Sequence, residues 1–322
     1  MAGGHPRERT ALIVTVLNEA ATIDTLLESV AAQTRPPDEV VIADGGSTDG
    51  TREALQRWSS RLPLRVIQAP GANIARGRNL AIQSAQGELI AVTDAGVRLE
   101  PDWLEQLHVG LTEDVHVVSG FFRADPRSPF ERALGATTLP AVEDVAPDAF
   151  LPSSRSVLFR RRAWEQVGGY PEWLDYCEDV VFDLALQRAG CRFTFAPGAI
   201  AWFRPRQSAR AFFRQYYLYA RGDGKAGLWW RRHAIRYATY VIAAIVLWRR
   251  SRAAWLLPLG AAAYTRRPYR RLNLDRLTPA EALYVLSLPA AIRLVGDVAK
   301  MLGYPVGVCW RLRRAWTSRS SS

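Results

Sequence analysis

The chain has 322 residues, of which 48% are hydrophobic, so it can form one large domain plus an appendage. Its three cysteines and four histidines show neither metal-ligand nor pairing spacing, which argues against a zinc site and a disulfide framework and suits a reducing compartment. The polar N-terminus leads straight into a predicted strand, so no signal peptide is expected.

Charge is divided unevenly along the chain. The formal net charge is +11, yet residues 1–200 carry 27 acids against 19 arginines, whereas residues 201–322 carry 4 acids against 21 arginines and 2 lysines. The second part also holds seven of the 11 tryptophans. Apolar runs bordered by Trp and Arg are typical of a membrane interface, so we expect an anionic membrane surface as a partner in preference to nucleic acid.

Strands and helices alternate over the first hundred residues. The hydrophobic pattern predicts strands at 11–17, 39–43, 64–68 and 88–93, and helices at 22–33, 51–59 and 74–85. This alternation indicates βαβ units and a mostly parallel sheet, as in α/β nucleotide-binding folds.

The pattern continues less regularly up to residue 205. It predicts helices at 101–111, 162–167 and 178–189, and strands at 115–122, 156–159 and 192–196. Residues 124–152 are rich in Pro, Ala and acids and are predicted to be mostly loop. We therefore expect a catalytic domain at 8–205 and a basic, aromatic-rich helical region at 206–322.

The second region contains a predicted helix at 208–219 and apolar runs at 237–248, 253–264 and 280–298. A straight transmembrane helix needs about 20 apolar residues, and arginine clusters flank both ends of the first two runs. Short re-entrant or surface-lying helices are therefore expected, with tilted spanning helices or a soluble helical cap as the alternatives.

Three acids follow predicted strands. Glu19, Asp44 and Asp94 should meet at the carboxyl edge of the sheet, where ligands of open α/β sheets bind. Together with the neighbouring Arg78-Asn79 pair they would form a polar site that is costly to maintain unless it holds a ligand.

These motifs resemble those of the family 2 glycosyltransferases, inverting enzymes with the GT-A nucleotide-diphospho-sugar fold. The resemblance covers residues 10–220 approximately and rests on five motifs in order: VTVLNE at 14–19, VIADGGSTDGT at 41–51, GRN at 77–79, TDAG at 93–96, and ED at 178–179 with QRAG at 187–190. It implies an α/β GT-A catalytic domain followed by a membrane-associated helical region.

The resemblance also implies roles for single residues around the donor, a nucleotide sugar. Asp44 would bond the nucleobase or ribose, and Arg78 would flank the base or the diphosphate. Val16, Asn18 and Glu19 would line the nucleoside pocket.

Asp94 stands where the family usually carries Asp-x-Asp, the motif that holds a divalent metal. Here Gly96 replaces the second acid. Magnesium and manganese can keep several waters, so Asp94 plus the donor diphosphate could hold one, and we expect a weakened metal dependence. Arg204 and Arg206 are candidates to supply part of the missing positive charge, with a plain surface role as the alternative.

Glu178 and Asp179 begin a predicted helix. By resemblance Asp179 is the general base that takes the acceptor proton, and Glu178 supports the acceptor pocket; a helix-capping role is the alternative and is compatible with both. Asp49 is interpreted as a helix-start acid. The Gln-x-x-Arg-Trp motif of processive synthases is missing, since Leu218-Tyr219 follows Gln215, which favours single additions.

The resulting expectation is inverting, non-processive transfer from a nucleoside-diphosphate sugar to a lipid-linked or cell-surface glycan acceptor, at the cytoplasmic face of a bacterial inner membrane. Transfer to polyprenyl phosphate, an inactive nucleotide-sugar-binding pseudo-transferase and a nucleic-acid-binding protein are the alternatives.

Overall fold

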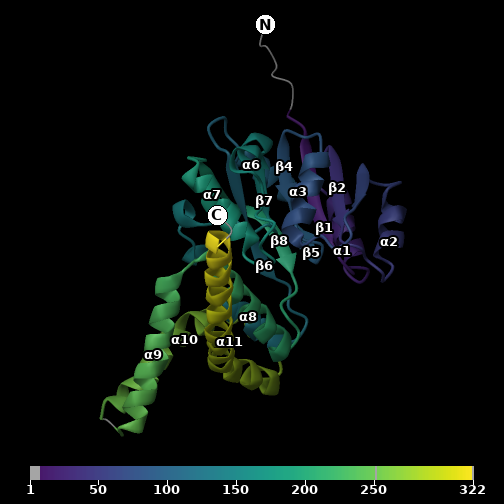
Figure 1. Cartoon of the computed structure of the whole chain (residues 1–322). Helices are drawn as coiled ribbons and strands as arrows, with labels where there is room; N and C mark the ends of the chain where they lie inside the picture. Colours follow the sequence, from purple (N-terminus) through teal and green to yellow (C-terminus); the bar gives the residue numbers. More distant parts are fainter. Residues whose placement is uncertain (1–7, 251, 321–322) are drawn as a thin grey trace. The chain divides into compact units, whose positions relative to one another are not determined.

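The computed structural model describes residues 8–250 and 252–320 (Figure 1). The chain divides into two compact units. The first comprises Val142–Phe203 together with the chain up to Arg123, and the second comprises Ala124–Ala141 together with the chain from Arg204 onward. The junction after Phe203 lies close to the expected boundary at residue 205, but the segment Ala124–Ala141, which was assigned to the catalytic domain, groups with the C-terminal helices.

The first unit is built on an eight-stranded sheet with the order β3-β2-β1-β4-β7-β6-β8-β5. Its strands are β1 (Thr10–Val16), β2 (Glu39–Asp44), β3 (Leu64–Gln68), β4 (Leu89–Val92), β5 (Val97–Leu99), β6 (Val117–Ala124), β7 (Val157–Arg160) and β8 (Phe193–Phe203). The half formed by β3, β2, β1 and β4 is parallel, as predicted. Beyond β4 the strand pairs β4–β7, β6–β7 and β5–β8 are antiparallel, so the sheet is mixed.

Helices cover both faces of this sheet. They are α1 (Ile23–Ala31), α2 (Thr51–Trp58), α3 (Ile74–Ser84), α4 (Trp103–Val109), α6 (Arg161–Val167) and α7 (Glu178–Arg188). Alternate residues of β1 enter two separate apolar clusters: Leu12 and Val14 pack with residues of α1, α2 and α4, whereas Ala11 and Ile13 pack with residues of α3, α6 and α7. A strand buried on both faces needs the unbroken apolar run seen here.

Two elements of the first unit differ from the prediction. The short strand β5 was not predicted, and β8 extends to Phe203 although a strand end was expected at residue 196. Both differences have one cause, because β5 pairs with the far end of β8, where Val97 lies opposite Phe203. A three-residue strand has too short a pattern to be recognised without its partner.

The segment 124–152 is not mostly loop as predicted, because it contains α5 (Pro129–Thr138) and the short helices η1 (Val142–Asp144) and η2 (Pro147–Ala149). Ser128 precedes α5, and its hydroxyl accepts a hydrogen bond from the Glu131 amide at 3.2 Å. Pro129 occupies the first helical turn. Ser-Pro-x-Glu is a helix-start signature, which the composition of the segment obscured.

The second unit is helical, with α5, α8 (Ala209–Ala226), α9 (Trp230–Trp248), η3 (Arg252–Trp255), α10 (Leu256–Arg271) and α11 (Pro279–Ser320). Figure 1 shows α11 as one long helix beside α8. Pro289 and Arg293 lie inside α11, which continues through both.

Glycines allow α8 and α11 to touch backbone to backbone. A Cβ added to Gly307 would lie 2.1 Å from the carbonyl oxygen of Arg221, and one added to Gly303 would lie 2.1 Å from that of Tyr217. Glycines four residues apart on one helix face permit such close packing. The two helices can approach this closely because Gly303 and Gly307 have no side chain.

Gly307→Ala is therefore expected to destabilise the second unit by about 1–3 kcal/mol, since the new methyl group must push the two helices apart. The matched control is Gly260→Ala in α10, where an added Cβ meets nothing within 4 Å. That control should be neutral or stabilising by up to about 1 kcal/mol, because Ala favours helix. Thermal unfolding followed by circular dichroism compares them, and equal midpoints would contradict the close packing.

Large apolar side chains are exposed mainly on this unit. The following are each more than half exposed: Trp230, Trp248, Trp255, Leu256, Leu259, Leu283, Leu302, Leu312 and Trp316. Among the described helices, α11 is long and apolar enough over Pro279–Thr317 to cross a membrane, with a mean hydropathy of 1.5, by length and composition alone. The helix α11 is longer than the apolar run at 280–298, on which the expectation of short re-entrant or surface-lying helices rested.

Candidate active site

The carboxyl ends of β2, β1 and β4 lie side by side, because these strands are parallel neighbours in the sheet. Asp44 is the last residue of β2 and is aligned with Val16 of β1. Glu19 and Asp94 follow β1 and β4 within three residues. The sheet therefore brings the three predicted acids to one edge.

Asp44 is fully buried, and its carboxylate is already bound by the chain. Oδ1 accepts from the amides of Ser47 at 2.8 Å and Gly46 at 3.2 Å, and Oδ2 accepts from Nε of Arg52 at 2.8 Å. Burial alone would raise the pKa of Asp44, but these hydrogen bonds outweigh it and lower the pKa. Asp44 thus fixes the loop after β2, and Arg52, which is half exposed, is the partner that a nucleoside would have to replace.

Asn18 and Glu19 join the loops after β1 and β2. Asn18 has a left-handed backbone with φ of 57°, and its Oδ1 accepts from the Thr48 amide at 2.9 Å. The Glu19 amide donates to the Thr51 hydroxyl at 2.9 Å. The side chain of Val16, by contrast, packs in the apolar core and is 4% exposed, and the role of this residue in binding the donor stays a prediction.

Asp49 holds the start of α2. Its Oδ1 accepts from the Thr51 amide at 3.1 Å and from the Thr51 hydroxyl at 2.5 Å, while Oδ2 accepts from the Ala20 amide at 3.1 Å. These contacts agree with its interpretation as a helix-start acid.

Arg78 connects Asp94, which follows β4, with Glu178 at the start of α7. Its Nη1 donates to Oε1 of Glu178 at 2.7 Å, and its Nη2 donates to Oδ1 of Asp94 at 2.9 Å. The guanidinium is 2% exposed and lies 5.3 Å from the ring centroid of Tyr170. Burial acts to lower the pKa of Arg78, but the two carboxylates raise it above its usual value, so the cation is permanent.

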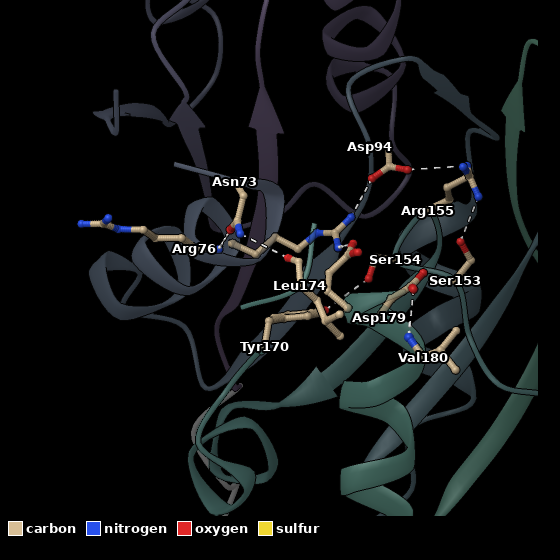
Figure 2. Close-up of polar contacts among 12 residues, drawn as sticks. Asn73, Arg76, Asp94, Ser153, Ser154, Arg155, Tyr170, Leu174, Asp179 and Val180 are labelled. Atoms are coloured by element: carbon tan, nitrogen blue, oxygen red, sulfur yellow. Dashed lines mark hydrogen bonds and ion pairs between the residues drawn. The ribbon is translucent and has the colours of Figure 1, made fainter. Parts of the chain in front are cut away.

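Asp94 has a second cationic neighbour that the sequence did not indicate. Nε of Arg155 lies 3.5 Å from Oδ2 of Asp94, and Nη1 of Arg155 donates to the Ser153 hydroxyl at 3.2 Å (Figure 2). The Arg155 guanidinium also lies 4.7 Å from the ring centroid of Phe203. Asp94 is thus held between two arginines and remains 27% exposed on its side chain.

No second acid joins Asp94. Within the described residues, no group of three or more His, Cys, Asp or Glu side chains could hold a metal ion. An added Cβ at Gly96 would meet nothing within 4 Å, so the position of the missing acid is open space. A divalent cation bound at Asp94 would therefore need oxygen ligands from outside this group of side chains.

Glu178 and Asp179 lie in the first turn of α7, where acids favour the helix dipole. Glu178 is 6% exposed, whereas Asp179 is more exposed and its Oδ1 accepts from the Val180 amide at 2.8 Å. Figure 2 shows Asp179 on the same side of α7 as the Asp94–Arg155 pair. Of these two acids, Asp179 is the one that an incoming hydroxyl can reach.

Two acids of α7, Glu178 and Asp183, have raised pKa values. Burial, followed by the charge of Asp179, raises the pKa of Glu178 to about 7 despite the opposing ion pair with Arg78. Burial and the same neighbour raise the pKa of Asp183 well above its usual value. Asp183 is 4% exposed, and its Oδ2 has no hydrogen-bond partner in the described chain, so its surroundings disfavour the charged carboxylate.

Asn79 and Tyr170 support this cluster structurally. The Asn79 amide nitrogen donates to the Tyr170 carbonyl at 2.9 Å, and its Oδ1 accepts from the Tyr170 amide at 2.9 Å. The tyrosine is thereby fixed beneath Arg78. The role of Tyr170 was not predicted from the sequence, although it follows the Gly168-Gly169 pair, whose φ values are both positive and which forms a fixed bend.

Arg204 and Arg206 belong to the second unit. Arg204 is committed to Glu131, since its Nε and Nη2 donate to Oε1 of Glu131 at 3.0 and 2.7 Å. Arg206 is exposed. Their contribution to the donor site stays a prediction.

Comparison with known proteins gives the family. Residues 11–164 match the family model described as "Glycosyl transferase family 2". The chain is 30% identical over 237 residues to the succinoglycan biosynthesis protein ExoA of Rhizobium meliloti. The aligned region covers 66% of this chain and 68% of ExoA. It is 26% identical over 228 residues to the glycosyltransferase AglE of Haloferax volcanii, covering 68% of this chain and 73% of AglE.

Solved structures agree on the fold. The mannosyltransferase PcManGT from Pyrobaculum calidifontis, in complex with GDP-Man and Mn²⁺, has a TM-score of 0.58 at 23% identity and covers 95% of this chain and 88% of its own. S. aureus TarS 1-349 in complex with UDP-GlcNAc has a TM-score of 0.53 at 17% identity, covering 95% and 92%. The GT-A fold expected from the motifs is confirmed. The chain belongs to glycosyl transferase family 2 and is a glycosyltransferase.

Proposed function

We propose that the enzyme transfers a sugar, with inversion and one unit at a time, from a nucleoside-diphosphate sugar to a lipid-linked or cell-surface glycan acceptor at the cytoplasmic face of the cell membrane. The observation that carries the proposal is Arg78, which joins Asp94 on the donor side to Glu178 beside Asp179. The relative ExoA is a succinoglycan biosynthesis protein, and PcManGT and TarS bind GDP-Man and UDP-GlcNAc, which supports this substrate class.

In the proposed reaction the acceptor hydroxyl oxygen attacks the anomeric carbon, and the bond from that carbon to the diphosphate oxygen breaks. Asp179 takes the hydroxyl proton as general base. The leaving nucleoside diphosphate keeps the electron pair of the broken bond. Its growing negative charge would face Arg78 and Arg155, and a preorganised cation in a partly desolvated site stabilises such charge strongly.

We propose a divalent cation, Mg²⁺ or Mn²⁺, that binds only together with the donor, because Asp94 is a single carboxylate held between two arginines. Both ions accept oxygen ligands from carboxylate, phosphate and water. When bound, the cation would neutralise charge on the departing diphosphate.

This proposal predicts a conditional thermal shift. Mn²⁺ alone should leave the unfolding midpoint unchanged, whereas Mn²⁺ with GDP or UDP should raise it. At a hundredfold excess of nucleotide over Kd, the free energy of unfolding should increase by about 2.7 kcal/mol. Asp94→Asn should lose the part that depends on Mn²⁺, since Asn still accepts from Arg78 but is a poor metal ligand.

The control for the thermal shift is Asp114→Asn, an exposed acid of the first unit that pairs with Arg192. It should behave as the wild type. A full shift by nucleotide without any metal, in wild type and Asp94→Asn alike, would contradict metal binding at this position.

The proposed membrane location is supported by the second unit. It exposes tryptophans and leucines along α9, α10 and α11, and residues 201–322 carry 23 cationic residues against 4 acids. An apolar surface rich in Trp and Arg suits the interface of an anionic membrane.

A further inference from the structure

The helices of the second unit contain a buried charged cluster that the catalytic proposal does not use. At its centre is Asp297 of α11, which is 3% exposed. Its carboxylate accepts hydrogen bonds from Nε of Arg236 at 2.8 Å, from the Tyr240 hydroxyl at 3.1 Å and from the Tyr264 hydroxyl at 2.8 Å. With one cation and two hydroxyls from α9 and α10, this carboxylate is fully satisfied.

Two further cations flank Asp297 on the same face of α11. Arg293 precedes it by four residues and Lys300 follows it by three, which are the spacings of neighbours on a helix surface. The Arg293 guanidinium lies 4.8 Å from the ring centroid of Tyr264, and the Lys300 ammonium lies 4.8 Å from that of Tyr216. Both cations are thus held in place by aromatic rings.

Neither cation has an acid of its own. In the described part of the chain, no carboxylate lies within ion-pair distance of Arg293 or Lys300, and Nε of Arg293 is buried without a hydrogen-bond partner. Burial and the charges of Arg236 and Arg293 lower the pKa of Lys300 to about 8. The charges of Asp297 and Asp223 act on this pKa in the opposite direction. With Arg236, Arg293 and Lys300 around the single carboxylate of Asp297, the cluster carries more positive than negative charge.

The surface next to the cluster is apolar. Leu294, Val298 and Leu302 alternate with the charged residues along α11 and are 51%, 39% and 55% exposed. On α9, Val241 and Ile242, close in sequence to Tyr240, are 54% and 59% exposed. A free anion or a nucleic acid would gain nothing from these side chains, whereas a ligand with an acyl or prenyl chain would cover them.

We propose that Arg293 and Lys300 form a binding site for the phosphate group of a membrane lipid, whose hydrocarbon chain lies along the exposed apolar residues of α11 and α9. Guanidinium and ammonium groups are the usual partners of phosphate oxygens. The site lies entirely within the second unit, whose helices are shown in Figure 1. The inference deepens the proposed function and rests on its membrane location, but it uses none of the catalytic residues.

The test measures binding of the full-length protein to two kinds of phosphatidylcholine vesicle, doped with phosphatidic acid or with oleate to the same negative surface potential. General attraction is equal for both, so the ratio of the two affinities reports recognition of phosphate. We expect the wild type to favour phosphatidic acid by about tenfold, and Arg293→Gln/Lys300→Gln to show a ratio of about one.

The matched control is Arg231→Gln/Arg232→Gln. These arginines are exposed, belong to the same unit and also lie over tryptophan rings, so the same charge is removed. This variant should bind both vesicles more weakly and keep the ratio. Because neither Arg293 nor Lys300 pairs with an acid, their replacement leaves no carboxylate unpaired, and Arg293→Lys/Lys300→Arg should keep the preference.

A wild-type ratio of one, or an unchanged ratio in Arg293→Gln/Lys300→Gln, would overturn the proposal. So would competition by inorganic phosphate as effective as that of the lipid, which would indicate a site for free phosphate. Vesicles doped with a long-chain prenyl phosphate separate the two lipid sources, since preference for either lipid supports the site and identifies its ligand.

Nucleoside diphosphate binding, measured by calorimetry on the same variants, should not change. If the wild type prefers phosphatidic acid but binds no nucleoside diphosphate, the proposed function is refuted and the lipid site is not.

Discussion

Asp179→Asn is expected to reduce sugar transfer by about a thousandfold while donor binding is unchanged, because the acceptor hydroxyl loses the group that takes its proton. The substitution is mild structurally. Asn keeps an Oδ1 that can accept from the Val180 amide, so the start of α7 remains capped. Transfer measured by release of nucleoside diphosphate, with donor affinity measured by calorimetry, separates the two effects.

Asp114→Asn serves as the control for this loss of turnover, since Asp114 is exposed and pairs only at the surface with Arg192. Its turnover should equal that of the wild type. If Asp179→Asn retains more than a tenth of the wild-type rate, which is about a hundred times the residual rate expected, the assignment of Asp179 as the base would be wrong.

Arg78→Met is expected to be the most damaging substitution at the site, with a loss of about 3–5 kcal/mol in the free energy of unfolding at pH 8. Met fills similar volume against the Tyr170 ring but leaves Glu178 as a buried acid without its cation. Chemical denaturation reports the stability. Donor affinity should fall as well, because the same guanidinium binds Asp94.

The effect of Arg78→Met should depend on pH in a defined direction. Without Arg78, the pKa of Glu178 rises above its value of about 7, further from the ordinary 4.5 of an unfolded chain. The folded state then holds a proton that the unfolded state has lost, so stability falls as pH rises from about 4.5 through 7 and beyond. The loss should be smaller at pH 5 than at pH 8.

Arg76→Met is the matched control for Arg78→Met. Arg76 lies on the same helix, is exposed, and points away from Asp94 in Figure 2. Its replacement should change stability by less than about 0.5 kcal/mol at either pH. If both variants lose stability equally, the ion pairs of Arg78 are not what holds the site together.

Local patterns were sufficient for the parallel half of the sheet. The runs that became β1 and β2 are apolar on both faces, and such strands must be buried between helices wherever the rest of the chain goes. Because parallel neighbours end at the same edge, the positions of Glu19, Asp44 and Asp94 followed from the sequence. The helix α5, which was not predicted, is also encoded locally, because Ser128, Pro129 and Glu131 form its start. The Pro, Ala and acid content of the surrounding segment is typical of a loop and obscured this signal.

Other features required partners that are distant in sequence. Arg155 reaches Asp94 across 61 positions because β7 enters the sheet antiparallel beside β4, and no periodicity in the sequence predicts that pairing. The strand β5 exists because β8 lies opposite it.

The sequence by itself determined the family, the acids at the sheet edge and the basic apolar character of the C-terminal region, since these depend on residue type and short-range spacing. The tertiary structure alone decided which acids have raised pKa values and which cations lack an acid at ion-pair distance. Burial against specific neighbours raises the pKa of Glu178 and Asp183, and the helix packing of the second unit leaves Arg293 and Lys300 without an acid. Desolvation and charge pairing act through space, so they depend on contacts that the linear chain does not display.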